Sequence, residues 1–184
     1  MTPELPVYLD HHATTPVDAR VLASMLPFFE QQYGNASSLH HVYGQVARTA
    51  VNQAREQVAG LLNVQPREVV FTSGATEANN LAIKGSLAAV PAGSHLIVNA
   101  AEHKSVLDVA ARLARRGVEG TILPVDQFGC VDPKAVLNAI RPTTILVSAM
   151  MGNNEVGSIN PVKEIAQVCA ERSVTFHSDV TQAA

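Results

Sequence analysis

The feature that most constrains the fold is an alternation, from residue 68 onward, between short apolar, β-branched runs and longer segments with helical spacing. The runs that predict strands are EVVFT, HLIVN, GTILP, TILVSA and VTFH, at residues 68–72, 95–99, 120–124, 144–149 and 174–177. Helices are expected between them, near residues 75–89, 104–116, 132–140 and 161–172. Because the runs are continuously apolar and each precedes a helical segment, they favour a parallel sheet covered on both faces. The sequence therefore predicts an α/β fold with an open, doubly wound sheet.

The residues before 68 follow a different pattern. Thr15 followed by Pro16 is typical of a helix start, so we expect a helix from there to about Gln32. The stretch YGNASSLHH interrupts it. A second helix is indicated by apolar residues at helical spacing, which are Val46, Ala50, Ala54, Val58 and Leu61.

Composition limits the class of protein. Of the 184 residues 47% are apolar, which is enough for a core and excludes a largely disordered chain. A net charge of −3 without a basic stripe argues against a nucleic-acid partner. The sequence has neither a secretory signal nor an apolar run near the roughly 20 residues that span a bilayer, so we expect no membrane partner. Two cysteines indicate a reducing compartment, and we expect a soluble, cytoplasmic protein.

Ligands of open α/β sheets bind beyond the carboxyl ends of the strands, so the residues after each expected strand are the candidates for chemistry. After the first run comes TSGATEANN, at residues 72–80, where small residues allow close approach and the first amides of the next helix can bind an anion. Thr76 adds a hydroxyl donor. The segment matches neither a Walker loop nor a G-x-G-x-x-G fingerprint. An ordinary capped turn is the alternative.

Three later strand ends also carry polar residues. His103 can stack on a flat ligand or titrate near neutral pH, or it is a polar loop residue. Asn153 and Asn154 can contact a ligand, or they build a turn with the neighbouring glycines. Asp179 can pair with a protonated ring nitrogen, or it caps the following segment. Together these groups fit a phosphorylated aromatic cofactor better than a nucleotide.

Other histidines and cysteines give weaker signals. The histidine pairs at 11–12 and 40–41 have no Cys, Asp or Glu at a familiar metal-ligand spacing, so we expect no metal site. Cys130 falls in an expected turn and Cys169 in an expected helix. We expect both to be packing residues rather than nucleophiles.

Six stretches spread over residues 7–183 resemble, in the same order, the amino-terminal half of a cysteine desulfurase of the class V aminotransferase family, in the branch of iron–sulfur cluster and nitrogenase-type enzymes. They are YLDHHATTPVD, YGNASSLHHVYG, VVFTSGATEANNLAIKG, AAEHKSVLD, TILVSAMMGNNEVGSINP and FHSDVTQA. The resemblance implies the large domain of a fold-type I enzyme that uses pyridoxal phosphate (PLP), incomplete at its C-terminus. It implies an amino-terminal segment over residues 1–15 and a partial PLP-binding domain over 16–184.

The resemblance also implies which residues bind the cofactor. Ala75 and Thr76 correspond to the turn that binds the PLP phosphate. Asp179 corresponds to the carboxylate that pairs with the pyridine nitrogen, and Gln182 to the residue that hydrogen-bonds the phenolic oxygen.

Two further residues are assigned to the reaction by the resemblance. His103 corresponds to the catalytic imidazole that stacks on the pyridine ring and assists proton transfer. Asn154 corresponds to the amide near the phenolic oxygen and the substrate carboxylate. The implied reaction removes sulfur from L-cysteine, giving alanine and an enzyme persulfide for an iron–sulfur scaffold or another sulfur acceptor. The family normally forms homodimers.

The sequence departs from the family pattern in one respect. The Schiff-base lysine of the family lies in a Ser-His-Lys motif after the point that matches Ala184, and the persulfide cysteine lies further on. The lysines present are Lys84, Lys104, Lys134 and Lys163, all in expected helices or at their starts. We therefore expect these 184 residues to be inactive alone and to need a homodimer partner or a complementing carboxyl-terminal half. A selenocysteine lyase, another class V PLP enzyme, and a non-catalytic PLP-binding or pairing fragment are the alternatives.

Overall fold

Four of the five expected strands form one parallel sheet in the computed structural model, which describes residues 6–183. They are β1 (His95–Asn99), β2 (Glu119–Leu123), β3 (Thr144–Ser148) and β4 (Thr175–His177), and each bound lies within one residue of the expected one. Their order is β2-β1-β3-β4, and every pairing is parallel. The alternation of strands and helices in the sequence therefore predicted this part of the fold correctly.

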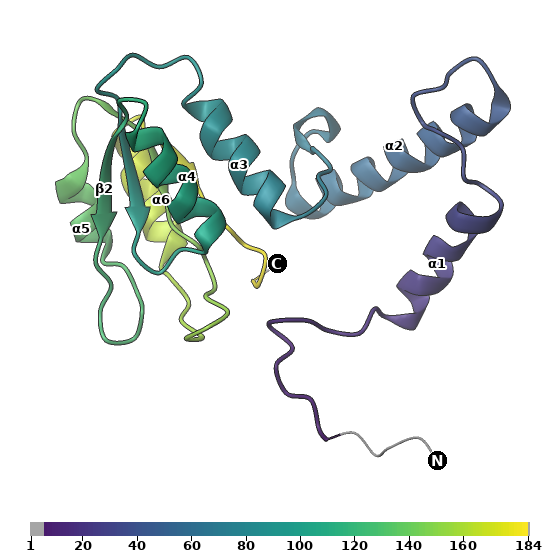
Figure 1. Ribbon diagram of the computed structural model, residues 1–184, viewed down its shortest axis with the longest axis horizontal. Coiled ribbons are helices and arrows are strands. Elements are labelled where there is room, and N and C mark those ends of the chain that lie inside the picture. The colour runs from purple at the N-terminus through teal and green to yellow at the C-terminus, as the bar shows by residue number, and fades with distance from the viewer. Residues whose placement is uncertain (1–5, 184) are drawn as a thin grey trace. The chain divides into compact units, whose positions relative to one another are not determined.

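Helices cover both faces of the sheet (Figure 1). They are α3 (Ala75–Ser86), α4 (Lys104–Ala114), α5 (Pro133–Ala139) and α6 (Val162–Glu171). Successive residues of β1 point to opposite faces, as a strand requires. Leu96 and Val98 pack in the core cluster that contains residues of α3 and α4, whereas Ile97 packs in the cluster that contains residues of α5 and α6. The expected doubly covered α/β architecture is confirmed.

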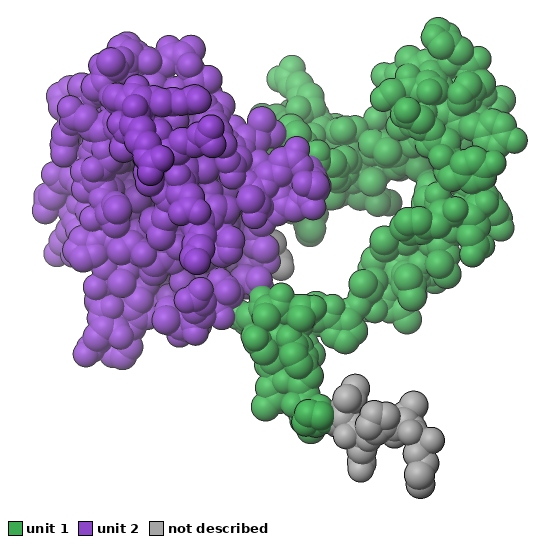
Figure 2. Space-filling view, in the orientation of Figure 1, with its two compact units in different colours: residues 1–71 green, residues 72–184 purple. Residues whose placement is uncertain are grey.

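The chain divides into two compact units, residues 1–71 and residues 72–184 (Figure 2). The sheet and its four helices belong to the second unit. Residues 1–5 of the expected amino-terminal segment, and Ala184, lie outside the described residues.

The first unit contains α1 (Ala19–Glu30), α2 (Val42–Leu62) and a short 3-10 helix, η1 (Pro66–Glu68). The expected start of the first helix at Thr15 and Pro16 was wrong. Asp18 is the N-cap instead, because its carboxylate accepts a hydrogen bond from the Arg20 amide at 2.8 Å. The second helix forms as expected from its apolar spacing.

The strand expected at residues 68–72 does not form. A β-branched run becomes a strand only when a neighbouring strand takes its backbone hydrogen bonds, and none of the four described strands pairs with these residues. The Val69 carbonyl accepts a hydrogen bond from the Arg55 guanidinium instead, and that guanidinium lies 5.2 Å from the centre of the Phe71 ring. Residues 68–72 therefore form the end of η1 and an extended segment.

Candidate functional site

The carboxyl ends of the parallel strands and the amino end of α3 meet at one edge of the second unit (Figure 1). Asn79, in the second turn of α3, joins them. Its Nδ2 donates to Asp179 Oδ2 at 2.8 Å and to Ser105 Oγ at 2.9 Å. Asp179 follows β4, and Ser105 is in the first turn of α4. Segments that the sequence separates by 100 residues are thus held together by one buried amide.

Asp179 is buried but ionised. Its Oδ1 accepts hydrogen bonds from the Thr181 amide at 3.0 Å and from the Thr181 hydroxyl at 2.6 Å. Burial alone raises the pKa of Asp179, but the hydrogen bonds from Thr181 and Asn79 and the nearby His177 outweigh it and lower the pKa. The capping role expected as the alternative is therefore present at Oδ1, while Oδ2 keeps room for a further donor beside Asn79.

His103 is the N-cap of α4. Its Nδ1 accepts a hydrogen bond from the Ser105 amide at 3.1 Å and lies 2.9 Å from Ser105 Oγ. The residue as a whole is exposed. Because Nδ1 faces the helix, Nε2 is the ring nitrogen left for contact with a ligand.

The first turn of α3 presents backbone amides without a side-chain cap. Its N-cap is Gly74, with a φ of +158° that favours glycine. Among the described residues, the amides of Ala75 and Thr76 have no hydrogen-bond acceptor, which is the arrangement that binds anions at helix amino termini. A carboxylate stands in the same turn, since Glu77 accepts from the Ser73 amide at 2.7 Å and from the Ser73 hydroxyl at 2.6 Å. Those bonds stabilise the Glu77 carboxylate and lower its pKa, and they hold the carboxylate beside Ser73.

The two adjacent asparagines after β3 differ in their contacts. Asn153 is buried, and its side chain bonds to the Ala101 carbonyl at 2.8 Å and to the Glu155 and Val156 amides at 2.7 and 2.9 Å. It builds the turn that was expected as the alternative. Asn154 is half-buried, and its side chain forms no hydrogen bond within residues 6–183, which leaves its amide available to a ligand.

Gln182 lies in the turn after β4 and is half-buried. This turn packs against the loop that contains the asparagines. A Cβ on Gly152 would lie 3.3 Å from Ala183 Cβ and 3.5 Å from the Gln182 carbonyl oxygen, so glycine allows the two segments to approach. The structure thus brings Gln182 to the same edge as Asn154 and Asp179.

Comparison with known protein families assigns the chain to one of them. The sequence matches the aminotransferase class-V family over residues 7–184. The chain belongs to the class-V aminotransferase family.

Several relatives of this class-V aminotransferase chain are cysteine desulfurases. The cysteine desulfurase IscS of Dechloromonas aromatica is 49% identical over 185 residues, which cover 100% of this chain and 46% of the relative. The IscS of Anaeromyxobacter sp. (strain K) is 49% identical over 180 residues, which cover 97% of this chain and 45% of the relative. The chain therefore spans about half the length of the curated relatives that it matches.

Solved structures share the fold. The structure of SspA in complex with cysteine has a TM-score of 0.91 and 39% identity, and the match covers 96% of this chain and 51% of SspA. A NifS-like protein has a TM-score of 0.92 and 36% identity, and the match covers 97% of this chain and 50% of the NifS-like protein. The expected resemblance to cysteine desulfurases and the expected fold-type I architecture are borne out by these likenesses.

Three buried polar residues of this class-V aminotransferase chain were missed by the reasoning from sequence. Asn79, Glu102 and Ser105 are 4%, 6% and 7% exposed. A signal for two of them was present, because Asn79 and Ser105 lie one helical turn from the apolar residues Ile83 and Val109, on the faces that the helices bury. A polar residue in a buried stripe indicates a specific partner.

Glu102 has the most perturbed carboxyl group at this edge. One oxygen accepts a hydrogen bond from the Met150 amide, and the other, Oε2, is buried without a partner among the described residues. Burial, together with the nearby charge of Asp179, raises the pKa of Glu102 to about 7, although the bond from Met150 opposes the rise.

The two cysteines have different surroundings. Cys169 is buried in the core between the sheet and α6, where burial raises the pKa of its thiol to about 11 and disfavours the nucleophilic thiolate. Cys130 is half-buried, with its Sγ 3.6 Å from the Ile159 carbonyl oxygen. Both contacts favour the packing role expected from the sequence.

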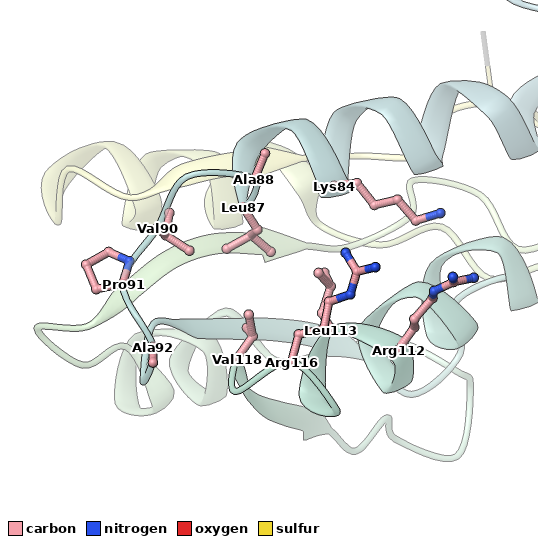
Figure 3. Close-up of a pocket in the computed structure, with 10 residues that line it drawn as sticks. All are labelled: Lys84, Leu87, Ala88, Val90, Pro91, Ala92, Arg112, Leu113, Arg116 and Val118. Carbon is pink, nitrogen blue, oxygen red and sulfur yellow. The ribbon is translucent and has the colours of Figure 1, made fainter.

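A cavity of about 450 Å³ lies at the other end of α3 and α4 (Figure 3). It has an apolar wall that includes Leu87 and Leu113, and the cationic side chains of Lys84, Arg112 and Arg116 border it. None of the candidate cofactor residues lines it.

Two negative findings concern the part of the chain that the structure describes. Within residues 6–183, no three His, Cys, Asp or Glu side chains come together as a metal site. No helix in that range is long and apolar enough to cross a membrane.

Proposed function

We propose that residues 1–184 form the PLP-binding part of a cysteine desulfurase. The observation that carries the proposal is the buried, ionised carboxylate of Asp179 at the end of β4. An ion at this position is costly unless it has a cationic or hydrogen-bonding partner. A protonated pyridine nitrogen is such a partner, and Oδ2 keeps an acceptor position for it.

The other residues at this edge fit the remaining parts of the cofactor. The amides of Ala75 and Thr76 would hold the phosphate, and His103 would contact the ring. Gln182 would donate to the phenolic oxygen. When bound, PLP supplies an electron-withdrawing ring that stabilises negative charge developing on the substrate.

Substrate contacts follow from the groups that remain available. The amide of Asn154 binds the substrate carboxylate, and Nε2 of His103 holds the proton that is exchanged with the substrate. L-cysteine is the proposed substrate, with alanine and a persulfide as products. The relatives named as cysteine desulfurases and the SspA structure with cysteine support this choice.

The Schiff-base lysine and the persulfide cysteine would come from the part of the family's length that residues 1–184 do not span. We accordingly propose that these residues work with a complementing carboxyl-terminal half, as a cytoplasmic homodimer that delivers sulfur to an iron–sulfur scaffold or another acceptor. The name IscS of the relatives supports the link to iron–sulfur cluster assembly. Residues 1–184 assayed alone with PLP and L-cysteine are expected to give no sustained alanine release.

A chimaera tests the proposal directly. Residues 1–184 replace the matching segment of the Dechloromonas aromatica relative, to which they are 49% identical. The expected result is a PLP-loaded protein that releases alanine from L-cysteine. Asp179→Asn in this chimaera is expected to lower the rate of alanine release by about 100-fold, the scale on which loss of one electrostatic partner acts in an active site.

The matched control is Asp108→Asn, which changes an exposed aspartate of α4 that forms no hydrogen bond in the described structure. Its rate is expected to equal that of the parent chimaera. A folded, PLP-loaded chimaera that releases no alanine would overturn the proposal. Faster release from selenocysteine than from cysteine would assign the site to a selenocysteine lyase.

A further inference from the structure

Two buried side chains link His103 to Asp179 in the second unit. Asn79 Nδ2 lies 2.8 Å from Asp179 Oδ2 and 2.9 Å from Ser105 Oγ. Ser105 Oγ in turn lies 2.9 Å from His103 Nδ1. The four side chains therefore form one continuous hydrogen-bonded series across the edge of the sheet.

The chemistry of the groups fixes the direction of each hydrogen bond. The carboxylate of Asp179 only accepts, so the group of Asn79 that faces it is the NH₂. The second hydrogen of that NH₂ goes to Ser105 Oγ, which acts as the acceptor there. The hydroxyl hydrogen of Ser105 is then free to donate to its other neighbour, His103 Nδ1.

His103 Nδ1 consequently accepts hydrogen bonds from two donors. The Ser105 backbone amide donates to it at 3.1 Å, and the Ser105 hydroxyl donates to it at 2.9 Å. A hydrogen on Nδ1 would face both donors. The neutral imidazole therefore carries its hydrogen on Nε2, the nitrogen that points away from the helix.

We infer that Asn79 and Ser105 are positioning residues. They hold His103 in the Nε2–H tautomer and fix its position relative to the carboxylate of Asp179. The inferred role in catalysis rests on the proposed desulfurase function, whereas the tautomer is a property of the chain itself. In the reaction, the arrangement makes Nε2 of His103 the hydrogen donor toward the substrate. It also couples His103, which would contact the cofactor ring, to Asp179, which would pair with the ring nitrogen.

The test reads the tautomer by ¹⁵N NMR of the full 184-residue chain labelled on histidine. The measurement is made at a pH where the ring is neutral, and His103 is assigned by comparison with His103→Gln. The expected wild-type spectrum shows the Nε2–H tautomer. If His103 carries its hydrogen on Nδ1 in the wild-type chain, the inference is overturned without any further variant.

Ser105→Ala removes the hydroxyl and leaves the backbone amide in place. Loss of one neutral hydrogen bond is expected to move the tautomer ratio roughly fivefold toward Nδ1–H. Ser105→Thr keeps the hydroxyl and is expected to restore the wild-type ratio. The matched control is Ser94→Ala, another buried serine, whose hydroxyl donates to the Pro91 carbonyl at 2.8 Å outside this network. An unchanged ratio in Ser105→Ala contradicts the inference.

Kinetics of the chimaera separate this inference from the proposed function. Ser105→Ala is expected to lower kcat roughly fivefold while KM for L-cysteine stays unchanged, and Ser94→Ala to change neither. A tautomer shift without a loss of kcat would overturn the role in the reaction. An inactive parent chimaera counts against the desulfurase proposal alone, because the tautomer is measured on the 184-residue chain without cofactor.

Discussion

Glu102 is expected to make the second unit less stable as the pH rises through neutrality. Its pKa rises from 4.5 to about 7 on folding, chiefly because of burial. The folded chain therefore binds the proton of Glu102 more tightly than the unfolded chain does. The stabilisation is fully present below pH 4.5 and is lost as the pH passes 7. At about 1.4 kcal/mol for each factor of ten in proton affinity, the loss amounts to about 3 kcal/mol.

Glu102→Gln isolates this effect. The amide keeps an oxygen for the Met150 amide and cannot ionise. We expect the variant and the wild type to have similar free energies of unfolding at pH 4.5, and the variant to be about 3 kcal/mol more stable at pH 8. Urea denaturation followed by circular dichroism measures the difference. The three tyrosines, at positions 8, 33 and 43, all lie in the first unit, so tyrosine fluorescence does not report on this region.

The comparison with the variant is needed because other buried groups titrate in the same range. Burial lowers the pKa of His95 and of His177, so their contribution to stability grows with rising pH, opposite to that of Glu102. Both histidines are present in the two proteins, and their effect cancels in the difference. Glu164→Gln, at an exposed position of α6, is the control and is expected to show no such pH dependence. A stability difference between wild type and Glu102→Gln that stays constant from pH 4.5 to 8 would refute the reasoning.

Three further substitutions test the packing and the loops, each by urea denaturation followed by circular dichroism. Ile97→Ala empties a site with 0% exposure and is expected to cost about 3 kcal/mol, whereas a loss below 1 kcal/mol would mean that the core has collapsed around the site. Asn160→Leu is expected to cost about 3 kcal/mol, because it leaves the Val131 amide and the Met150 carbonyl without their partner; an unchanged stability would show that water replaces it. Asp132→Ala removes the cap of α5 and is expected to cost about 1 kcal/mol, with Asp132→Asn retaining most of the stability.

Strands were predictable where the sheet itself supplied their partners. The runs at 95–99 and 144–149 became strands within one residue of the expected bounds because each lies between two strands of the same sheet. The run at 68–72 has equal β propensity but no described neighbour, so its local preference was not sufficient. The N-cap of α1 is Asp18 instead of Thr15 for a related reason. Several residues near a helix start can cap it, and the sequence does not rank them.

The site was predictable only in its parts. The rule that ligands bind beyond the carboxyl ends of parallel strands pointed to His103, to the pair Asn153 and Asn154, and to Asp179. The structure places these residues at one edge. That rule did not distinguish Asn153 from Asn154, and only the family resemblance selected Asn154. The structural difference between them depends on the Ala101 carbonyl, which bonds to Asn153 from 52 residues away. Burial of Glu102 likewise depends on the loop after β3, which supplies the Met150 amide.

The position of Asn79 shows why the core and the site are mechanically linked. Asn79 and Ile83 lie four residues apart on α3 and share its buried face. Ile83 is completely buried in the cluster that contains β1 and α4, so its packing sets the rotation and height of α3 against the sheet. The same rotation decides whether the amide of Asn79 reaches Asp179 and Ser105 together, at distances that differ by only 0.1 Å. A rotation of the helix that relieved any misfit at Ile83 would lengthen one of these bonds. Because Asn79 is buried, weakening either bond is costly. The apolar side chain at 83 therefore determines the polar geometry at 79, and through it the orientation of the two groups assigned to opposite parts of the cofactor.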